Sequence, residues 1–150
     1  MRLRTTLAAA TAVFALATGL PAAAQDSGLT AAVQQDYAAN LAALFDDFHR
    51  HPELSGLEVR TAGIMAARLG ALGYDVTTGV GGTGVVAVLR NGDGPTVMIR
   101  ADMDGLPLQE ASGLANASTV RQVDSDGVEK PVMHACGHDV HITALIGTAR

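Results

Sequence analysis

Residues 85–101 read VVAVLRNGDGPTVMIRA and contain two apolar runs separated by the sequence NGDGP. Valine and isoleucine are enriched in strands, whereas Asn-Gly and Gly-Pro pairs are typical of turns. The stretch therefore predicts two strands, at residues 85–90 and 96–101, joined by a hairpin turn. The second strand leads directly into DMDGLPLQE, which places two aspartates at a strand end.

Helices are predicted on both sides of these strands. Between residues 29 and 49, apolar side chains recur every three or four positions, the pattern of a one-sided helix, which ends before Pro52. A second helix is expected to open at Ser55, because Glu58 follows at the spacing of a capping box. A third is predicted to begin at Asp139. Helices that alternate with strands indicate an α/β fold.

The remaining segments predict turns and short strands. YDVTT at residues 74–78 predicts a short strand, and GVGGTG at residues 79–84 predicts a hairpin turn. The latter lacks the Gly-Lys-Ser/Thr ending of a phosphate-binding loop. Residues 111–131 are mostly polar or glycine, which predicts a long loop with a weak hairpin around DSDG at residues 124–127.

Residues 1–24 are predicted to form a cleavable secretory signal peptide. Two arginines precede an apolar run from Leu7 to Leu20, and three alanines follow Pro21. The apolar run is too short to cross a membrane, and the small residues suit a cleavage site. We therefore expect a periplasmic or secreted product without a membrane anchor, in which residues 25–150 form the mature chain. The alternative is a buried alanine-rich helix.

The composition excludes nucleic acid as an expected partner. The 150 residues carry a formal net charge of -5 and contain 3% aromatic residues and no tryptophan. An acidic chain with few aromatic side chains offers neither a phosphate-binding patch nor a surface on which bases stack.

Residues 133–141, MHACGHDVH, contain three of the five histidines and the single cysteine. In an extended backbone, His134, Cys136 and His138 would present one face. A thiolate and an imidazole two residues apart suit Zn²⁺, with Mn²⁺, Co²⁺ and Ni²⁺ as further candidates. Asp139 could accept the second ring N–H of a ligating histidine. The alternative is a polar turn that caps the following helix.

Asp102 and Asp104 form a second candidate site at the end of a predicted strand. Such positions commonly carry chemistry in α/β proteins, and two close carboxylates can bind a cation or orient a histidine. The alternative is a solvated acidic turn. His49 and His51, in contrast, are interpreted as structural, because His49 lies near a helix C-terminus, where a positive charge is favoured.

Three stretches carry a resemblance to a known family. They are HPELSGLE at residues 51–58, TGVVAVLRNGDGPTVMIRADMDGLPLQE at residues 83–110 and VMHACGHDVHITALIGTA at residues 132–149. In this order and spacing they resemble the metal-dependent amidohydrolases that cleave N-acyl amino acids. That group includes hippurate hydrolases, indoleacetyl-amino-acid hydrolases and N-acetyl-diaminopimelate deacetylases, and is related to dinuclear zinc aminoacylases and carboxypeptidases. The resemblance implies the N-terminal part of a zinc-exopeptidase-like catalytic domain, a mixed sheet with flanking helices.

The resemblance also implies roles for particular residues. Cys136 and His138 match the ACGHD motif that binds a pair of divalent metal ions, zinc or manganese, with cobalt or nickel as alternatives. Asp104 matches the aspartate that orients a ligand or takes part in catalysis. Asp102 stands where sister families have a ligand histidine, so its role departs from the pattern. The implied reaction is metal-assisted hydrolysis of the amide bond of N-acyl amino acids or peptides.

Members of this family have longer chains than the present sequence. Their catalytic glutamate, further metal ligands and dimerisation domain are expected beyond Arg150, and no Glu-Glu pair occurs in the 150 residues. We therefore expect the complete protein to be a homodimer and the 150-residue piece to have little or no activity. Two alternatives are an exported, non-catalytic metal-binding module and an inactive remnant. A thiol redox protein is disfavoured, because Cys136 has no resolving cysteine.

Overall fold

The computed structural model describes residues 27–150, so the signal peptide predicted at residues 1–24 lies outside the described part. The elements in chain order are α1 (Ser27–Asp36), the π-helical segment η1 (Tyr37–Leu41), α2 (Ala42–Arg50), α3 (Val59–Ala71), β1 (Asp75–Val80), β2 (Gly84–Val88), β3 (Arg121–Val123), β4 (Glu129–Pro131) and α4 (His138–Ala149). The α/β character predicted from the sequence is confirmed. Among residues 27–150, no helix combines the length and the apolar character that a membrane crossing requires.

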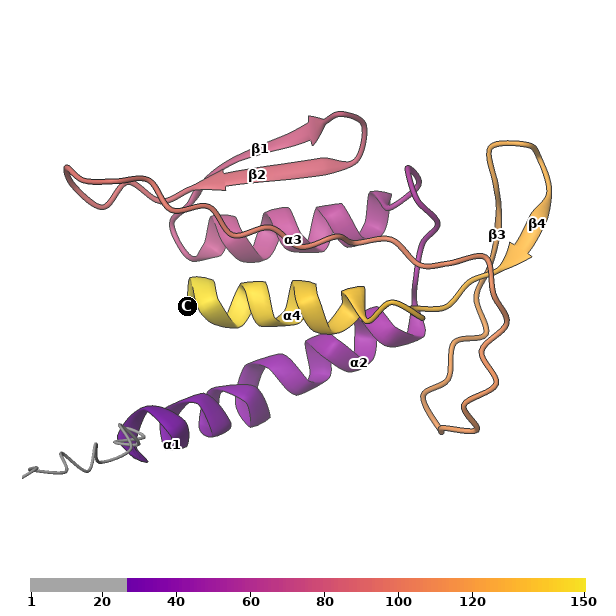
Figure 1. Cartoon of the computed structure of the whole chain (residues 1–150), viewed down its shortest axis with the longest axis horizontal. Helices are drawn as coiled ribbons and strands as arrows, with labels where there is room; N and C mark the ends of the chain where they lie inside the picture. Colours follow the sequence, from indigo (N-terminus) through magenta and orange to yellow (C-terminus); the bar gives the residue numbers. More distant parts are fainter. Residues whose placement is uncertain (1–26) are drawn as a thin grey trace, which may run out of the picture.

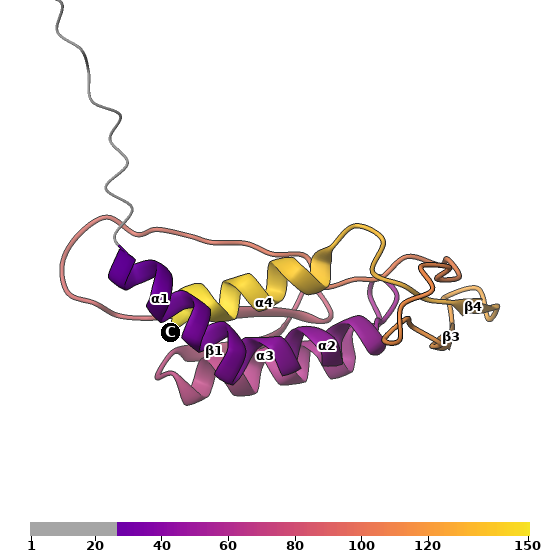
Figure 2. The same ribbon diagram turned by 90° about the horizontal axis from the view of Figure 1, so that it is seen from below.

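The helices form the centre of the structure. Helix α3 packs against the β1–β2 hairpin and against α4, and α4 packs in turn against α2 and η1 (Figure 1). The β3–β4 hairpin lies at the end of the molecule away from the C-terminus, as Figures 1 and 2 both show. Buried apolar side chains from η1, α2, α3 and α4 make the core: Leu41, Leu44, Phe48, Met65, Leu69, Ile142 and Ile146.

Two of the three predicted hairpin turns, at residues 79–84 and 124–127, are confirmed, whereas the turn predicted at NGDGP joins no pair of strands among residues 27–150. Strands β1 and β2 pair in antiparallel fashion, with Thr77 opposite Val86, and β3 pairs with β4 in the same way. The turn between β3 and β4 is held by Asp124, whose carboxylate accepts hydrogen bonds from the backbone N–H groups of Asp126 and Val128. The aspartate side chain thereby replaces a backbone acceptor in the turn.

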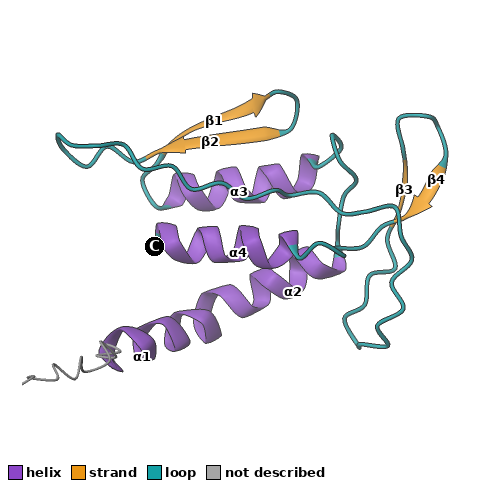
Figure 3. Cartoon of the chain, viewed as in Figure 1, coloured by secondary structure: helices purple, strands orange, loops and turns teal. Residues whose placement is uncertain are grey.

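The strand predicted at residues 96–101 is wrong. This segment has no strand partner and runs as an irregular coil, drawn as part of the long teal stretch in Figure 3. Val97 and Met98 are 82% and 85% exposed. A β-strand requires a neighbouring backbone to satisfy its N–H and C=O groups, and among residues 27–150 β2 pairs only with β1. Apolar, β-branched composition alone was therefore not enough to predict a strand at residues 96–101.

The predicted start of the second helix is also wrong. Helix α3 begins at Val59, and Ser55 does not cap it. The carboxylate of Glu53 instead accepts hydrogen bonds from the backbone N–H groups of Arg60 and Thr61, at 2.9 and 2.7 Å. Glu58 is buried and accepts a hydrogen bond from the Thr83 hydroxyl. The first-turn amides are thus satisfied by a side chain that lies well before the helix.

Candidate metal-binding site

Backbone pairing brings the two predicted site segments together. Leu106 and Met133 form an isolated antiparallel bridge, with N–H···O distances of 2.8 and 3.1 Å. The neighbouring Gly105 bridges to Leu54 in parallel fashion and donates its N–H to the carbonyl of Glu53 at 2.7 Å. The segment that contains Asp104 and the segment that leads into the histidine-rich turn therefore lie side by side.

The close contact between these two segments requires glycine at position 105. A Cβ atom there would lie 2.8 Å from Cγ1 of Val132 and 2.9 Å from Cβ of Pro52, distances that real Cβ atoms essentially never show. The DMDG segment can therefore pass between its neighbours only because its last residue has no side chain.

Asp104 and His138 are in direct contact. The Nδ1 atom of His138 lies 2.9 Å from the carbonyl oxygen of Asp104 and 3.0 Å from its Oδ1. A ring that donates from Nδ1 keeps a lone pair on Nε2, the arrangement that oriented metal-binding histidines commonly use. His138 is also the first residue of α4, and Gly137 before it has a φ of 76°, in the left-handed region. The sharp turn therefore aims the ring at Asp104.

The other residues of the turn do not share one face, contrary to the prediction. Cys136 is exposed and free, whereas His134 is only 6% exposed. The backbone at Ala135 and Cys136 forms a turn and is not extended, so alternate residues do not point the same way. Neither ring nitrogen of His134 has a hydrogen-bond partner among the described residues. Burial lowers the pKa of His134, so its imidazole is neutral at pH 7.

Asp102 and Asp139 also have partners other than those expected. Asp102 forms an ion pair with the exposed guanidinium of Arg100. Asp139, expected to orient a ligating histidine of its own turn, instead lies 2.7 Å from Nδ1 of His49 on α2. The residue that faces His138 is Asp104.

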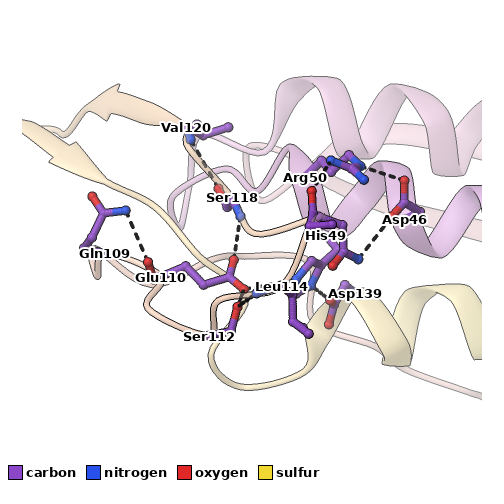
Figure 4. Close-up of polar contacts among 12 residues, drawn as sticks. Asp46, His49, Arg50, Gln109, Glu110, Ser112, Leu114, Ser118, Val120 and Asp139 are labelled. Atoms are coloured by element: carbon purple, nitrogen blue, oxygen red, sulfur yellow. Dashed lines mark hydrogen bonds and ion pairs between the residues drawn. The ribbon is translucent and has the colours of Figure 1, made fainter.

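A buried cluster of charged groups surrounds His49 (Figure 4). Its Nδ1 contacts Oδ2 of Asp139 at 2.7 Å, and its Nε2 lies 3.3 Å from Oε1 of Glu110. No sequence pattern indicated this cluster. His49 was instead interpreted as structural, because it lies near a helix C-terminus, where a positive charge is favoured. His49 and Asp139 are 90 residues apart, and no local pattern marks them as partners. Glu110 directly precedes the loop predicted at residues 111–131, and no role was predicted for it.

The charges in this cluster reinforce one another. Burial by itself would lower the pKa of His49, but the hydrogen bond with Asp139 and the negative charge of Glu110 outweigh it and raise that pKa. Burial likewise opposes ionisation of Glu110, yet hydrogen bonds from Ser112 and Ser118 and the charge of His49 leave its pKa below the usual value. The cluster therefore favours a protonated imidazole between two carboxylates.

The donor atoms at the turn fit a first-row divalent ion in kind. Cys136 supplies a sulfur, and Nε2 of His138 is a neutral nitrogen held ready by Asp104, a combination that zinc and its neighbours accept. Across residues 27–150, no three cysteine, histidine, aspartate or glutamate side chains converge so as to hold an ion by themselves. The donors at this turn therefore match such an ion in kind only.

Comparison with known proteins identifies the family that this turn resembles. Residues 98–150 match the family described as Peptidase family M20/M25/M40. Hippurate hydrolase of Campylobacter jejuni is 43% identical over 103 residues, which cover 68% of this chain and 24% of that protein. Thermostable carboxypeptidase 2 of Saccharolobus solfataricus is 46% identical over 103 residues, with coverage of 67% and 24%. The chain therefore spans about a quarter of the length of these curated relatives.

A solved structure shows the same relationship in three dimensions. The YXEP protein of Bacillus subtilis, described as a dinuclear metal-binding peptidase from the M20 family, matches with a TM-score of 0.64 and 38% identity. The match covers 77% of this chain and 30% of that one. The fold class and the family resemblance predicted from the sequence are both confirmed.

Proposed function

Because this chain resembles the M20/M25/M40 peptidases in sequence and in structure, we propose that the protein hydrolyses the amide bond of N-acyl amino acids or peptides in a metal-dependent reaction. The observation that carries the proposal is the contact between Asp104 and His138, two residues after Cys136. It joins the two most specific motifs of the sequence at one point of the fold.

The proposal assigns a role to each of these residues. Cys136 and Nε2 of His138 are metal ligands, and Asp104 holds the His138 ring in the orientation and tautomer that binding needs. A divalent ion supplies polarisation of the amide carbonyl and lowers the pKa of the attacking water. We propose a pair of zinc or manganese ions, because the M20 structural neighbour is described as dinuclear and the donors suit both metals.

Substrate, assembly and location are part of the same proposal. The relatives named above are a hippurate hydrolase and a carboxypeptidase, which supports a small N-acyl amino acid or peptide as substrate. We further propose that the protein is a homodimer and is exported to the periplasm or secreted after cleavage following residue 24. The basic start and the short apolar run of residues 1–24 support export. Mass spectrometry of the protein from the cell envelope would give the mature N-terminus.

An activity assay on the full-length protein tests the proposal. Hippurate hydrolysis is measured after chelation and after addition of Zn²⁺ or Mn²⁺, for the wild type, H138Q and H141Q. His141 lies one turn further along α4 and is exposed, so H141Q is a matched control for a lost imidazole. We expect activity only with metal, a loss of about 100-fold or more in H138Q, and wild-type behaviour in H141Q. Tight metal binding without hydrolysis of any N-acyl amino acid would instead support a non-catalytic metal-binding module.

A further inference from the structure

We propose that His49 and Glu110 are positioning residues that hold the metal-binding turn in place through Asp139. This inference rests on the proposed function, because it concerns how the chain orients His138 and Cys136 toward an ion. Neither His49 nor Glu110 touches the turn's donor atoms in any contact of the described residues, so they act through Asp139.

The three side chains lie in a row: Asp139 from the first turn of α4, His49 from α2, and Glu110 from the loop that follows Pro107. The side chains of His49, Asp139 and Glu110 are 14%, 3% and 2% exposed. Nδ1 of the imidazole is hydrogen-bonded to Asp139 at 2.7 Å, and Nε2 lies 3.3 Å from the carboxylate of Glu110 as an ion-pair contact without hydrogen-bond geometry. The contacts with the two buried carboxylates therefore restrict the orientation of the ring.

Glu110 is itself held in place from its other side, as Figure 4 shows. Its Oε1 accepts a hydrogen bond from the Ser112 hydroxyl at 2.5 Å, and its Oε2 accepts one from the Ser118 amide at 2.6 Å. The Ser118 hydroxyl donates in turn to the carbonyl of Val132 at 2.7 Å. Val132 lies on the segment that enters the turn, so the network braces this segment as well as α4.

Asp139 transmits the position of His49 to the turn. Its Oδ1 accepts a hydrogen bond from the Val140 amide at 2.9 Å, and its carbonyl accepts one from the Thr143 hydroxyl at 2.7 Å. With Oδ2 held by His49, this carboxylate fixes the start of α4, whose first residue is His138. Asp104 holds the His138 ring from the other side. The direction of Nε2 therefore depends on both supports.

Fold stability alone does not account for such a cluster. Burying one imidazolium and two carboxylates carries a large desolvation cost, and apolar side chains of similar volume often stabilise a fold as well or better. A buried charged row that ends beside a candidate ligand is better explained by orientation. The expected consequence is a change in metal affinity that does not follow the change in stability.

Two substitutions at one position separate orientation from stability in the full-length protein. In H49N, the amide nitrogen of asparagine occupies the place of Nδ1 and still donates to Asp139. In H49Q, the amide nitrogen occupies the place of Nε2 and faces Glu110. Both variants lose the same charge and the same ring. We expect H49N to keep a Zn²⁺ dissociation constant within about threefold of wild type, and H49Q to weaken it by about 10- to 100-fold.

The measurements are Zn²⁺ competition with a chromophoric chelator, the rate at which an alkylating reagent modifies Cys136 with and without Zn²⁺, and the thermal midpoint. Weaker binding and faster alkylation in H49Q than in H49N, at similar thermal midpoints, support the proposal. If H49Q does not fold, H49A, which also lacks a donor to Asp139, replaces it, with weakened Zn²⁺ binding expected in a folded protein. Zn²⁺ binding that is equal in all variants, or that falls only in step with the thermal midpoint, overturns it. A wild type that binds no Zn²⁺ at Cys136 overturns the proposed function as well.

Discussion

Gly105 and Val132 approach each other so closely that a single methyl group at position 105 would lie 2.8 Å from Cγ1 of Val132. This packing sets the distance between the segment that carries Asp104 and the segment that leads to His138. The same close approach leaves no room for a side chain at position 105.

We expect G105A to destabilise the protein by about 1–3 kcal/mol, because the added methyl group must displace Val132 or Pro52. Gly63, within α3, is a matched control, because a methyl group added there would meet nothing within 4 Å. There, G63A should stabilise by about 0.5–1 kcal/mol through helix propensity. Urea denaturation measures both changes. Equal effects of the two substitutions would contradict the packing argument.

Removal of the carboxylate at position 104 should weaken metal binding. In D104N, His138 loses the charged partner that holds its Nδ1 proton, and we expect Zn²⁺ affinity to fall by about 10- to 100-fold. Asp102 pairs with Arg100 at the surface, so D102N should leave the affinity unchanged. Isothermal titration of both variants checks the pair. A larger loss in D102N would reassign the ligand-orienting role to that residue.

The cluster around His49 predicts a pH dependence of stability. The pKa of His49 is raised in the folded state, so its contribution is fully present below its unfolded value of about 6.5 and is lost as the pH rises through the folded value. The pKa of Glu110 is lowered, so its contribution is present above its unfolded value of about 4.5 and is lost as the pH falls through the folded value.

The stability advantage of wild type over H49Q should therefore be largest between about pH 4.5 and 6.5 and should decline toward pH 9. Denaturation curves at several pH values, with metal removed by a chelator, measure the difference directly. A constant difference across this range would mean that the pKa of His49 is the same in the folded and the unfolded protein.

The cap of α3 can be tested at Glu53. In E53A the amides of Arg60 and Thr61 lose their acceptor, and we expect a loss of about 1–2 kcal/mol. As a control, E129A removes an exposed ion pair with Arg121 and should cost no more than about 0.5 kcal/mol. S55A should hardly change the free energy of unfolding. A large loss of stability in S55A would instead support the capping box that was predicted from the sequence.

The exposed segment around Val97 and Met98 predicts self-association of the 150-residue chain. An exposed apolar stretch whose backbone groups have no partner among residues 27–150 is a site for intermolecular strand pairing. M98K places a charge in this stretch and should shift the chain toward monomer in light scattering. As a control, V140K places the same charge on the exposed face of α4 and should leave the association unchanged. Unchanged association in M98K would mean that another surface mediates the self-association.

Local patterns predicted the elements that depend on local interactions. The helix that begins at His138 and the hairpins before Gly84 and around Asp124 are set by periodicity and by turn residues, and all are present. The strand at residues 96–101 failed because strand formation depends on a partner that composition does not reveal. The same limit applies to the start of α3, whose amides are capped by Glu53 from outside the expected motif.

The candidate site divides in the same way. The motifs singled out Asp104, Cys136 and His138, and the structure places Asp104 against His138. The pairing of His49 with Asp139 could not be predicted, because it joins residues 90 positions apart and depends on how α2 meets α4. The prediction that His134, Cys136 and His138 present one face was wrong, because it assumed an extended backbone where the chain turns.

Backbone hydrogen bonds between Leu106 and Met133 close residues 106–133 into one long loop. The turn between β3 and β4 forms the far end of this loop and follows Ser112 and Ser118, which donate hydrogen bonds to Glu110. Residues can thus be inserted or deleted at this turn while the spacing of Asp104 and His138 stays the same.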